Sequence, residues 1–171
     1  MEATLLKQVE TRAMDLLAHK LDKNYTYHNL GHTQQVVQAV AEIGSHSGLK
    51  EEEILLLKIA AWFHDLGYMQ RYVGHEEDSI KMARAFLGEI GAPPATITEV
   101  EKLIEATILD LEPRSLLEQI IKDADLYNLA MPHAIEHSEE IRHEWKVFCD
   151  RNFTDEEWDV FNYDFFREHS Y

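Results

Sequence analysis

The sequence predicts an all-α fold, and three observations carry this prediction. Apolar residues recur at three- and four-residue spacing over most of the 171 residues, which is the periodicity of amphipathic helices. No run of alternating apolar and polar residues bounded by turn residues indicates a strand. The length and a hydrophobic content of 45% fit one ordinary domain with one core. We therefore expect a single-domain helical bundle.

Eight helices are expected, and the breaks between them have local causes. Glycine, serine and proline residues at 44–48, 67–74 and 91–94 end helices or cannot continue them. These breaks are interpreted as loops inside one domain. The expected helices span residues 3–20, 28–45, 50–66, 75–91, 95–109, 113–131, 134–150 and 154–167.

Two of the expected helix starts carry a capping pattern. Thr154 is followed three residues later by Glu157, a pair that can satisfy each other's free backbone N–H groups at a helix start. Ser115 and Glu118 repeat the pattern more weakly, because a proline and an arginine stand directly before them. Only the first pair supports the position of a helix start.

Composition and charge exclude several classes of function. A formal charge of -16 gives a surface that repels polyphosphate chains, so a general DNA- or RNA-binding protein is not expected. The longest apolar stretches are far shorter than the roughly 20 residues of a membrane span, and the first residues lack the basic head of a signal peptide. Cys149 stands alone, so no internal disulfide is possible. We expect a cytoplasmic protein with neither nucleic-acid polymers nor membranes as partners.

A histidine and an aspartate stand side by side at the end of a strongly apolar segment, EEEILLLKIAAWFHDLG. A buried, unpaired carboxylate costs several kcal/mol, so Asp65 beside His64 requires a cation, a network of donors or a metal. Gly67 allows the chain to turn away directly after the pair, which would leave it at the mouth of a cavity. The pair alone is weak evidence, because such dipeptides are common on the surface at helix ends.

Two further segments supply residues of the same kind. His28 and His32 are four positions apart, so on a helix they share one face at about 5 to 6 Å. Asp123 and Asp125 stand inside another apolar helix, where a buried carboxylate again needs a positive partner. Two histidines and two aspartates from three helices suit a divalent cation such as Mn, Mg, Co, Ni, Fe or Zn, with water completing the shell.

The order H…HD…D, with the last aspartate in a D-A-D helix, resembles the HD-domain metal-dependent phosphohydrolases, a superfamily that includes cyclic-nucleotide phosphodiesterases. The resemblance covers about residues 27–129, and residues 130–171 form a C-terminal helical extension of the same domain. It implies that the metal ligands are His32, His64, Asp65 and Asp125. Asp65 is also expected to take part in catalysis.

The YHN…H string that begins at Tyr27 is similar to that of the phosphodiesterases, in which the earlier histidine protonates the leaving oxygen. This similarity implies that His28 is the general acid. The sequence departs from the binuclear branches of the superfamily, because residues 104–110 contain no further histidine. We therefore expect one tightly held cation, and a second cation bridged through Asp65 and water stays open.

Three residues near these motifs are candidates for substrate binding. His75 begins a helix shortly after the HD pair, where many members of the superfamily keep a pocket histidine; a capping or solvent-facing role is the alternative. Arg71 and Lys122 are the basic residues nearest the motifs, and either could hold a phosphate oxygen. For each of them a surface ion pair is the alternative. Asp123 faces another side of its helix than Asp125 and at most orients a neighbour.

The C-terminal region carries two groups of residues without an assigned function. Its histidines are expected to be solvated: His133, His137, His143 and His169. Its aromatic residues fall at helical spacings that favour core packing, with a lid over the pocket or a dimer seam as alternatives: Trp145, Phe148, Trp158, Phe161, Phe165 and Phe166. A homodimer is left open.

The sequence thus predicts hydrolysis of a phosphomonoester or phosphodiester of a small molecule, with a nucleotide as the expected substrate class. The cation would activate a water for attack on phosphorus, and His28 would protonate the leaving oxygen. Two alternatives stay open. One is an HD-fold diiron oxygenase, which needs more ligands than the sequence offers. The other is a degenerate HD module that binds a nucleotide or a partner as a sensor.

Overall fold

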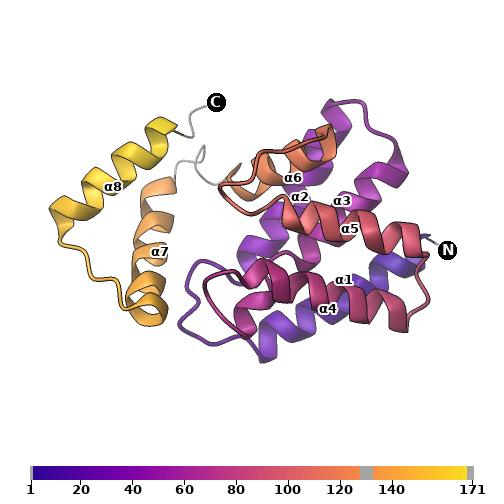
Figure 1. The fold of residues 1–171 in the computed structure, drawn as a ribbon, viewed down its shortest axis with the longest axis horizontal. Helices are drawn as coiled ribbons and strands as arrows, with labels where there is room; N and C mark the ends of the chain where they lie inside the picture. The colour runs from indigo at the N-terminus through magenta and orange to yellow at the C-terminus, as the bar shows by residue number, and fades with distance from the viewer. Residues whose placement is uncertain (1, 128–132, 169–171) are drawn as a thin grey trace.

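A computed structural model describes residues 2–127 and 133–168 (Figure 1). Within these residues the chain forms eight α-helices and one short 3-10 helix, and no strand, which confirms the all-α prediction. The elements are α1 (Glu2–His19), α2 (Leu30–His46), α3 (Glu51–Phe63), η1 (Leu66–Met69), α4 (His75–Glu89), α5 (Pro94–Glu105), α6 (Leu116–Asp125), α7 (Ala134–Cys149) and α8 (Asp155–Glu168). No helix among these residues is long and apolar enough to cross a bilayer.

Helix α3 is the centre of the bundle. Its first turn carries three glutamates, which the positive end of the helix dipole favours, and every later residue except Lys58 is apolar. Its second half, from Leu57 to Phe63, is buried apart from Lys58, and α3 packs against α1, α2, α4, α5 and α6. The residues that directly follow α3 are therefore delivered into the protein interior.

The two capping patterns behave as their sequences suggest. The Thr154 hydroxyl accepts from the Glu157 backbone N–H at 3.2 Å, and the Glu157 carboxylate accepts from the Thr154 backbone N–H at 2.8 Å, so this capping box is complete. At α6 only half of the box forms. Ser115 accepts from the Glu118 N–H at 3.2 Å, but the Glu118 carboxylate accepts from the backbone N–H of Arg114 instead of that of Ser115.

Three helices are shorter than the periodicity predicts. The helix expected over 50–66 ends at Phe63, and η1 follows after His64 and Asp65. The helix expected over 95–109 ends at Glu105, because the Lys122 ammonium donates to carbonyls of residues 108, 109 and 111 and holds that segment in turns. The helix expected over 113–131 spans residues 116–125, and residues 128–131 lie outside the described part of the chain.

Gly67 and Ser79 fix α4 against the end of α3. The Gly67 N–H donates to the Ser79 hydroxyl at 2.8 Å, and this hydroxyl donates to the His64 carbonyl oxygen at 2.5 Å. The backbone of α4 approaches so closely that a Cβ atom on Gly67 would lie 1.8 Å from the His75 carbonyl oxygen. Only glycine permits this approach, which sets His75 beside the HD pair.

Helices α7 and α8 lie beside the bundle formed by α1–α6 (Figure 1). Helix α7 rests on the segment before α2, where Phe148 stacks on Tyr25 with ring centroids 4.1 Å apart. The Thr26 hydroxyl donates to the Glu140 carbonyl oxygen at 2.9 Å. Helix α8 packs on α7 through Trp158, which is 2% exposed and meets Trp145 edge to face. The segment before α2 is therefore held between the bundle and the C-terminal helices.

Replacing Gly67 by alanine is expected to destabilise the protein by about 3 kcal/mol, because a backbone carbonyl cannot give way as a flexible side chain can. Gly88, which lies in the last turn of α4, is the matched control. Apart from the neighbouring backbone of its own helix, no atom lies within 4 Å of a Cβ placed there. Gly88→Ala should be neutral or stabilising by up to about 1 kcal/mol. Urea unfolding measures both, and equal midpoints for the two variants would contradict the close approach.

Candidate metal centre

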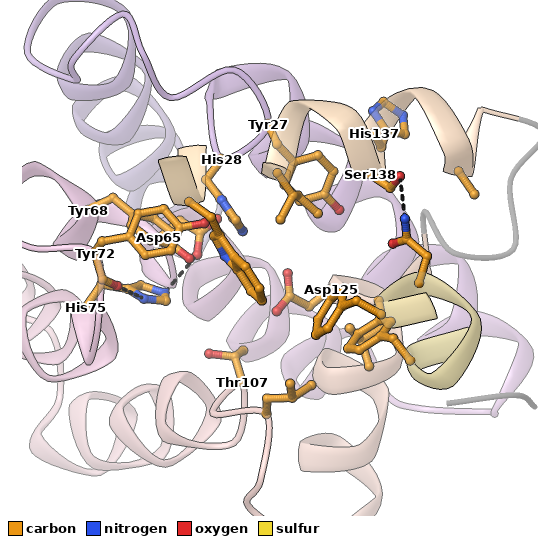
Figure 2. A pocket seen from close by; sticks show the side chains of 18 of the residues that line it. Tyr27, His28, Asp65, Tyr68, Tyr72, His75, Thr107, Asp125, His137 and Ser138 are labelled. Atoms are coloured by element: carbon orange, nitrogen blue, oxygen red, sulfur yellow. Dashed lines mark hydrogen bonds and ion pairs between the residues drawn. The ribbon is translucent and has the colours of Figure 1, made fainter. Parts of the chain in front are cut away.

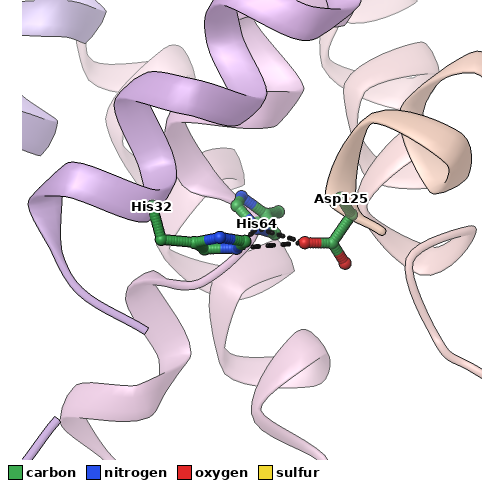
Figure 3. Close-up of side chains that lie close together, drawn as sticks. All are labelled: His32, His64 and Asp125. Carbon is green, nitrogen blue, oxygen red and sulfur yellow. Dashed lines mark hydrogen bonds and ion pairs between the residues drawn. The ribbon is translucent and has the colours of Figure 1, made fainter. Parts of the chain in front are cut away.

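Three helix ends bring four metal-ligating side chains together (Figure 3 draws three of them). His32 comes from the first turn of α2, His64 and Asp65 directly follow α3, and Asp125 is the last residue of α6. The Nε2 atoms of His32 and His64 are 3.4 Å apart and lie 3.1 and 3.2 Å from Asp125 Oδ1. They also lie 3.3 and 3.2 Å from Asp65 Oδ2.

The orientation of His64 presents a lone pair to this cluster. The residue is fully buried, and its Nδ1 lies 2.8 Å from the carbonyl oxygen of Ala61. A carbonyl oxygen only accepts, so Nδ1 carries the proton in the neutral ring. Nε2 then has its lone pair free, as a metal-ligating histidine requires.

The electrostatics of the cluster demand positive charge. Burial disfavours the imidazolium form of His32, but its contacts with Asp125 and Asp65 outweigh burial and raise its pKa to about 9. Burial likewise disfavours the ionised carboxylates, yet the neighbouring histidines hold the pKa values of Asp65 and Asp125 well below the ordinary range. The two carboxylates are therefore negative, and either protons or a cation must balance them.

The donor set fits a divalent cation. Asp65 Oδ2 is buried and makes no well-aligned hydrogen bond, although it lies within 3.3 Å of both imidazole Nε2 atoms. Such a buried oxygen is costly unless a positive partner satisfies it. The ligand atoms of His32, His64 and Asp125 all lie within 4.8 Å of one another. Mixed imidazole nitrogen and carboxylate oxygen ligands suit Mn, Fe, Co, Ni or Zn.

A pocket of about 250 Å³ opens beside the cluster (Figure 2). Asp65, Asp125 and His28 line it on the side of the HD pair, and residues of α7 and α8 line it elsewhere. The C-terminal aromatic residues in its wall are Trp145, Trp158, Phe161, Phe165 and Phe166. The sequence favoured core packing for these side chains; the structure uses them as a pocket wall as well, while Phe148 packs on Tyr25.

His28 lies near the cluster, but not on the helix where the sequence placed it. Helix α2 begins at Leu30, and Asn29 caps it by accepting from the Gly31 N–H at 2.8 Å. The prediction that His28 and His32 share a helix face is therefore wrong. Their rings still meet edge to face with centroids 5.7 Å apart, because the capped chain folds back over the first turn.

Glu144 of α7 holds His28 in place, and the sequence analysis missed this residue. The side chain is fully buried, and its Oε1 accepts from the backbone N–H groups of Tyr27 and His28 at 2.7 and 3.0 Å. Its Oε2 lies 2.5 Å from His28 Nδ1 and accepts from the Tyr72 hydroxyl at 3.3 Å. One signal was present: Glu144 falls on the apolar face of α7, three residues after Ile141.

A family model for the HD domain matches residues 29–129, which is more than half of the chain. The chain belongs to the HD domain family. Among solved structures, a predicted HD superfamily hydrolase from an uncultured Thermotogales bacterium is similar, with a TM-score of 0.63 and 22% identity over 92% of this chain and 87% of that chain. This likeness shows a shared helical fold. No curated protein matches the chain.

The HD domain brings one of the three predicted substrate residues to the cluster. His75 Nε2 lies 3.2 Å from Asp65 Oδ1, and the ring stacks on Tyr68 with centroids 3.7 Å apart. Arg71 does not line the pocket, since its guanidinium pairs with Glu77 and Asp78 at the surface.

Lys122 lines the pocket, but its ammonium group donates to three backbone carbonyls. Burial lowers the pKa of this side chain. Asp123 is no part of the His–Asp cluster, as expected. Of the C-terminal histidines, His137 lines the pocket against the prediction of a solvated side chain, and His169 lies outside the described residues.

We propose that His32, His64, Asp65 and Asp125 hold a divalent cation, and two neighbouring aspartates of α6 allow a matched test. Asp125→Asn removes a negative ligand and should weaken Mn binding by about 100-fold or more, since even outer partners contribute 10- to 100-fold. Asp123→Asn should bind Mn as the parent does. Elemental analysis after Mn loading and gel filtration measures this, and equal metal content in the two variants would exclude the site.

Proposed function

We propose that this HD domain hydrolyses phosphate esters of small molecules, with nucleotides as the substrate class. The observation that carries the proposal is the convergence, in one pocket, of a metal-ligating His–Asp cluster and a histidine held by a buried carboxylate. The fold that the chain shares with a protein described as a predicted HD superfamily hydrolase supports the same reaction class. Phosphoryl transfer requires positioned charge and a proton donor, and this pocket contains candidates for both.

Different residues are assigned different steps of the proposed ester hydrolysis. A divalent cation, when bound, supplies a Lewis acid that draws charge from a phosphoryl oxygen and acidifies water. We assign Asp65 the role of orienting the attacking water; in support, it lines the pocket and its Oδ2 lies within 3.3 Å of both imidazole Nε2 atoms of the cluster. Attack forms a new P–O bond and breaks the ester P–O bond, and the leaving alcohol oxygen then needs a proton.

We assign the supply of that proton to His28. Its Nδ1 lies against Glu144, so Nε2 is the nitrogen that remains for the leaving oxygen. The Glu144 carboxylate contacts Nδ1 and fixes the orientation of the ring, as a buried carboxylate does for the histidine of a catalytic triad. Glu144 therefore acts as a positioning residue.

The proposal is tested by incubating the purified, Mn-loaded full chain with nucleoside monophosphates, cyclic nucleotides and aryl phosphates, and measuring products. His28→Ala should keep its metal and slow hydrolysis of nucleotides by about 10² to 10⁴, the usual contribution of a general acid. Nitrophenyl phosphate, whose leaving group needs little protonation, should be affected much less. If no ester is hydrolysed, the proposed function is wrong; equal losses on both substrates would remove His28 as the acid.

Glu144→Gln isolates the role of the carboxylate. The glutamine carbonyl can still accept from the two backbone N–H groups, but its NH₂ group faces His28 Nδ1 and favours the other tautomer of the ring. Nucleotide turnover should fall by about 10² to 10⁴ with metal content unchanged. The ¹⁵N shifts of His28 should report the tautomer change.

Glu139→Gln on the same helix is the control, because Glu139 is 57% exposed and, among the described residues, forms an ion pair only with Arg142. This variant should match the parent in turnover and in ¹⁵N shifts. A purely structural role of Glu144 predicts a different result for Glu144→Gln: lower thermal stability, equal losses on nucleotide and nitrophenyl substrates, and an unchanged His28 tautomer.

A further inference from the structure

The pocket beside the cluster offers a ligand no free lysine or arginine among the described residues that line it. Lys122 is the one lysine or arginine among the described residues that line it. Its ammonium group donates to the carbonyl oxygens of Ile108, Leu109 and Leu111 at 2.8, 2.7 and 2.5 Å, which uses all three of its N–H groups. Glu76 adds a carboxylate to the wall. A second phosphate group would enter this pocket without a countercharge.

The wall formed by α7 and α8 is aromatic. Trp145, Trp158 and Phe161 lie in it, and the rings of Trp158 and Phe161 stack with centroids 5.3 Å apart at 17°. Aromatic surfaces of this kind bind flat, apolar ring systems by stacking and by apolar burial. The wall therefore suits the organic part of an ester and not its phosphate.

One polar side chain in this wall has a fixed orientation. The Ser138 hydroxyl donates its single proton to the Ile135 carbonyl oxygen at 3.0 Å. The hydroxyl can then only accept from Asn162, so the Asn162 NH₂ group faces Ser138 at 3.3 Å (Figure 2 draws this bond at Ser138). Asn162 lines the pocket, and its carbonyl oxygen Oδ1 is left as an acceptor with no hydrogen-bond partner among the described residues.

The acceptor and the cluster lie in different parts of the same pocket. Asp65 and Asp125 line it together with Ser138 and Asn162, and Figure 2 shows Asp125 between Asp65 and Ser138. A ligand whose phosphate lies at the aspartates would therefore direct its organic part toward α8.

We propose that the pocket selects esters that carry a single phosphate group and a flat, mostly apolar ring whose edge donates an N–H to Asn162 Oδ1. This inference rests on the proposed phosphohydrolase function and narrows its substrates. Compounds with two or more phosphates are rejected for want of positive charge. Rings without a donor on the edge lose one hydrogen bond and bind more weakly.

The test compares four probes with the Mn-loaded full chain. Adenosine 5′-monophosphate carries a ring amino group, and purine riboside 5′-monophosphate is the same molecule without it. Wild type should prefer the first by about 3- to 10-fold in kcat/KM, the effect of one neutral hydrogen bond. Adenosine triphosphate should react at least about 100-fold more slowly than the monophosphate. Phenyl phosphate gives the rate for a ring without any polar edge.

Two variants of Asn162 test whether this residue accepts a hydrogen bond from the ring of the substrate. In Asn162→Leu and Asn162→Ala the preference for the amino compound over purine riboside monophosphate should disappear. Val160→Ala is the control on α8, since Val160 is 61% exposed and lies outside the pocket, and should keep the full preference. The melting temperatures of all variants are measured alongside.

Binding of the ring alone separates this inference from the proposed function. Adenosine has no phosphate, and its stacking beside Trp145 and Trp158 should quench tryptophan fluorescence in metal-free protein, more strongly in wild type than in Asn162→Leu. If adenosine quenches the fluorescence but no ester is hydrolysed, the proposed phosphohydrolase function is wrong and the proposed ring-binding site is retained. Hydrolysis with a preference unchanged in both Asn162 variants, or with triphosphate used as well as monophosphate, would overturn the inference.

Discussion

The need for positive charge beside two carboxylates, the buried Asp65 and the partly buried Asp125, governs this structure. Helix α3 is apolar after its first turn except for Lys58 and is packed on by five other helices, so Asp65, which follows it directly, is only 4% exposed. The surrounding elements meet that need: α2 supplies His32, α6 ends at Asp125, and Gly67 lets α4 close over the pair. The arrangement of the bundle follows from delivering these groups to one point.

The sequence predicted the elements that depend on local patterns and missed contacts that depend on distant ones. The eight helices, and the His–Asp residues that meet in the cluster, could be recognised because periodicity and motif order are visible along the chain. The pairing of Glu144 with His28 could not be recognised, because the two residues are 116 positions apart in the sequence. Arg71 shows the converse: it is close to the HD pair in sequence, yet its guanidinium pairs with Glu77 and Asp78.

The two parts of the chain contribute different chemistry to one pocket. The residues matched by the HD family model supply the cluster. They also supply Lys122, whose ammonium group donates hydrogen bonds to backbone carbonyls. Helices α7 and α8, which lie beyond that match, supply the aromatic wall and Asn162. The His–Asp cluster thus lies in the bundle, and we propose that recognition of the organic group lies in helices beyond the family match.

Glu144 ties these two parts together. Among the described residues, its carboxylate has no lysine or arginine partner and is satisfied by two backbone N–H groups, His28 and the Tyr72 hydroxyl, close to the N-terminus of α2. The positive end of that helix dipole favours the negative charge there. Because the same carboxylate anchors α7 and contacts His28, one interaction positions both the wall proposed to bind the substrate's ring and the residue proposed to protonate its leaving oxygen. Movement of α7 away from the bundle would therefore disable proton transfer and ring binding together.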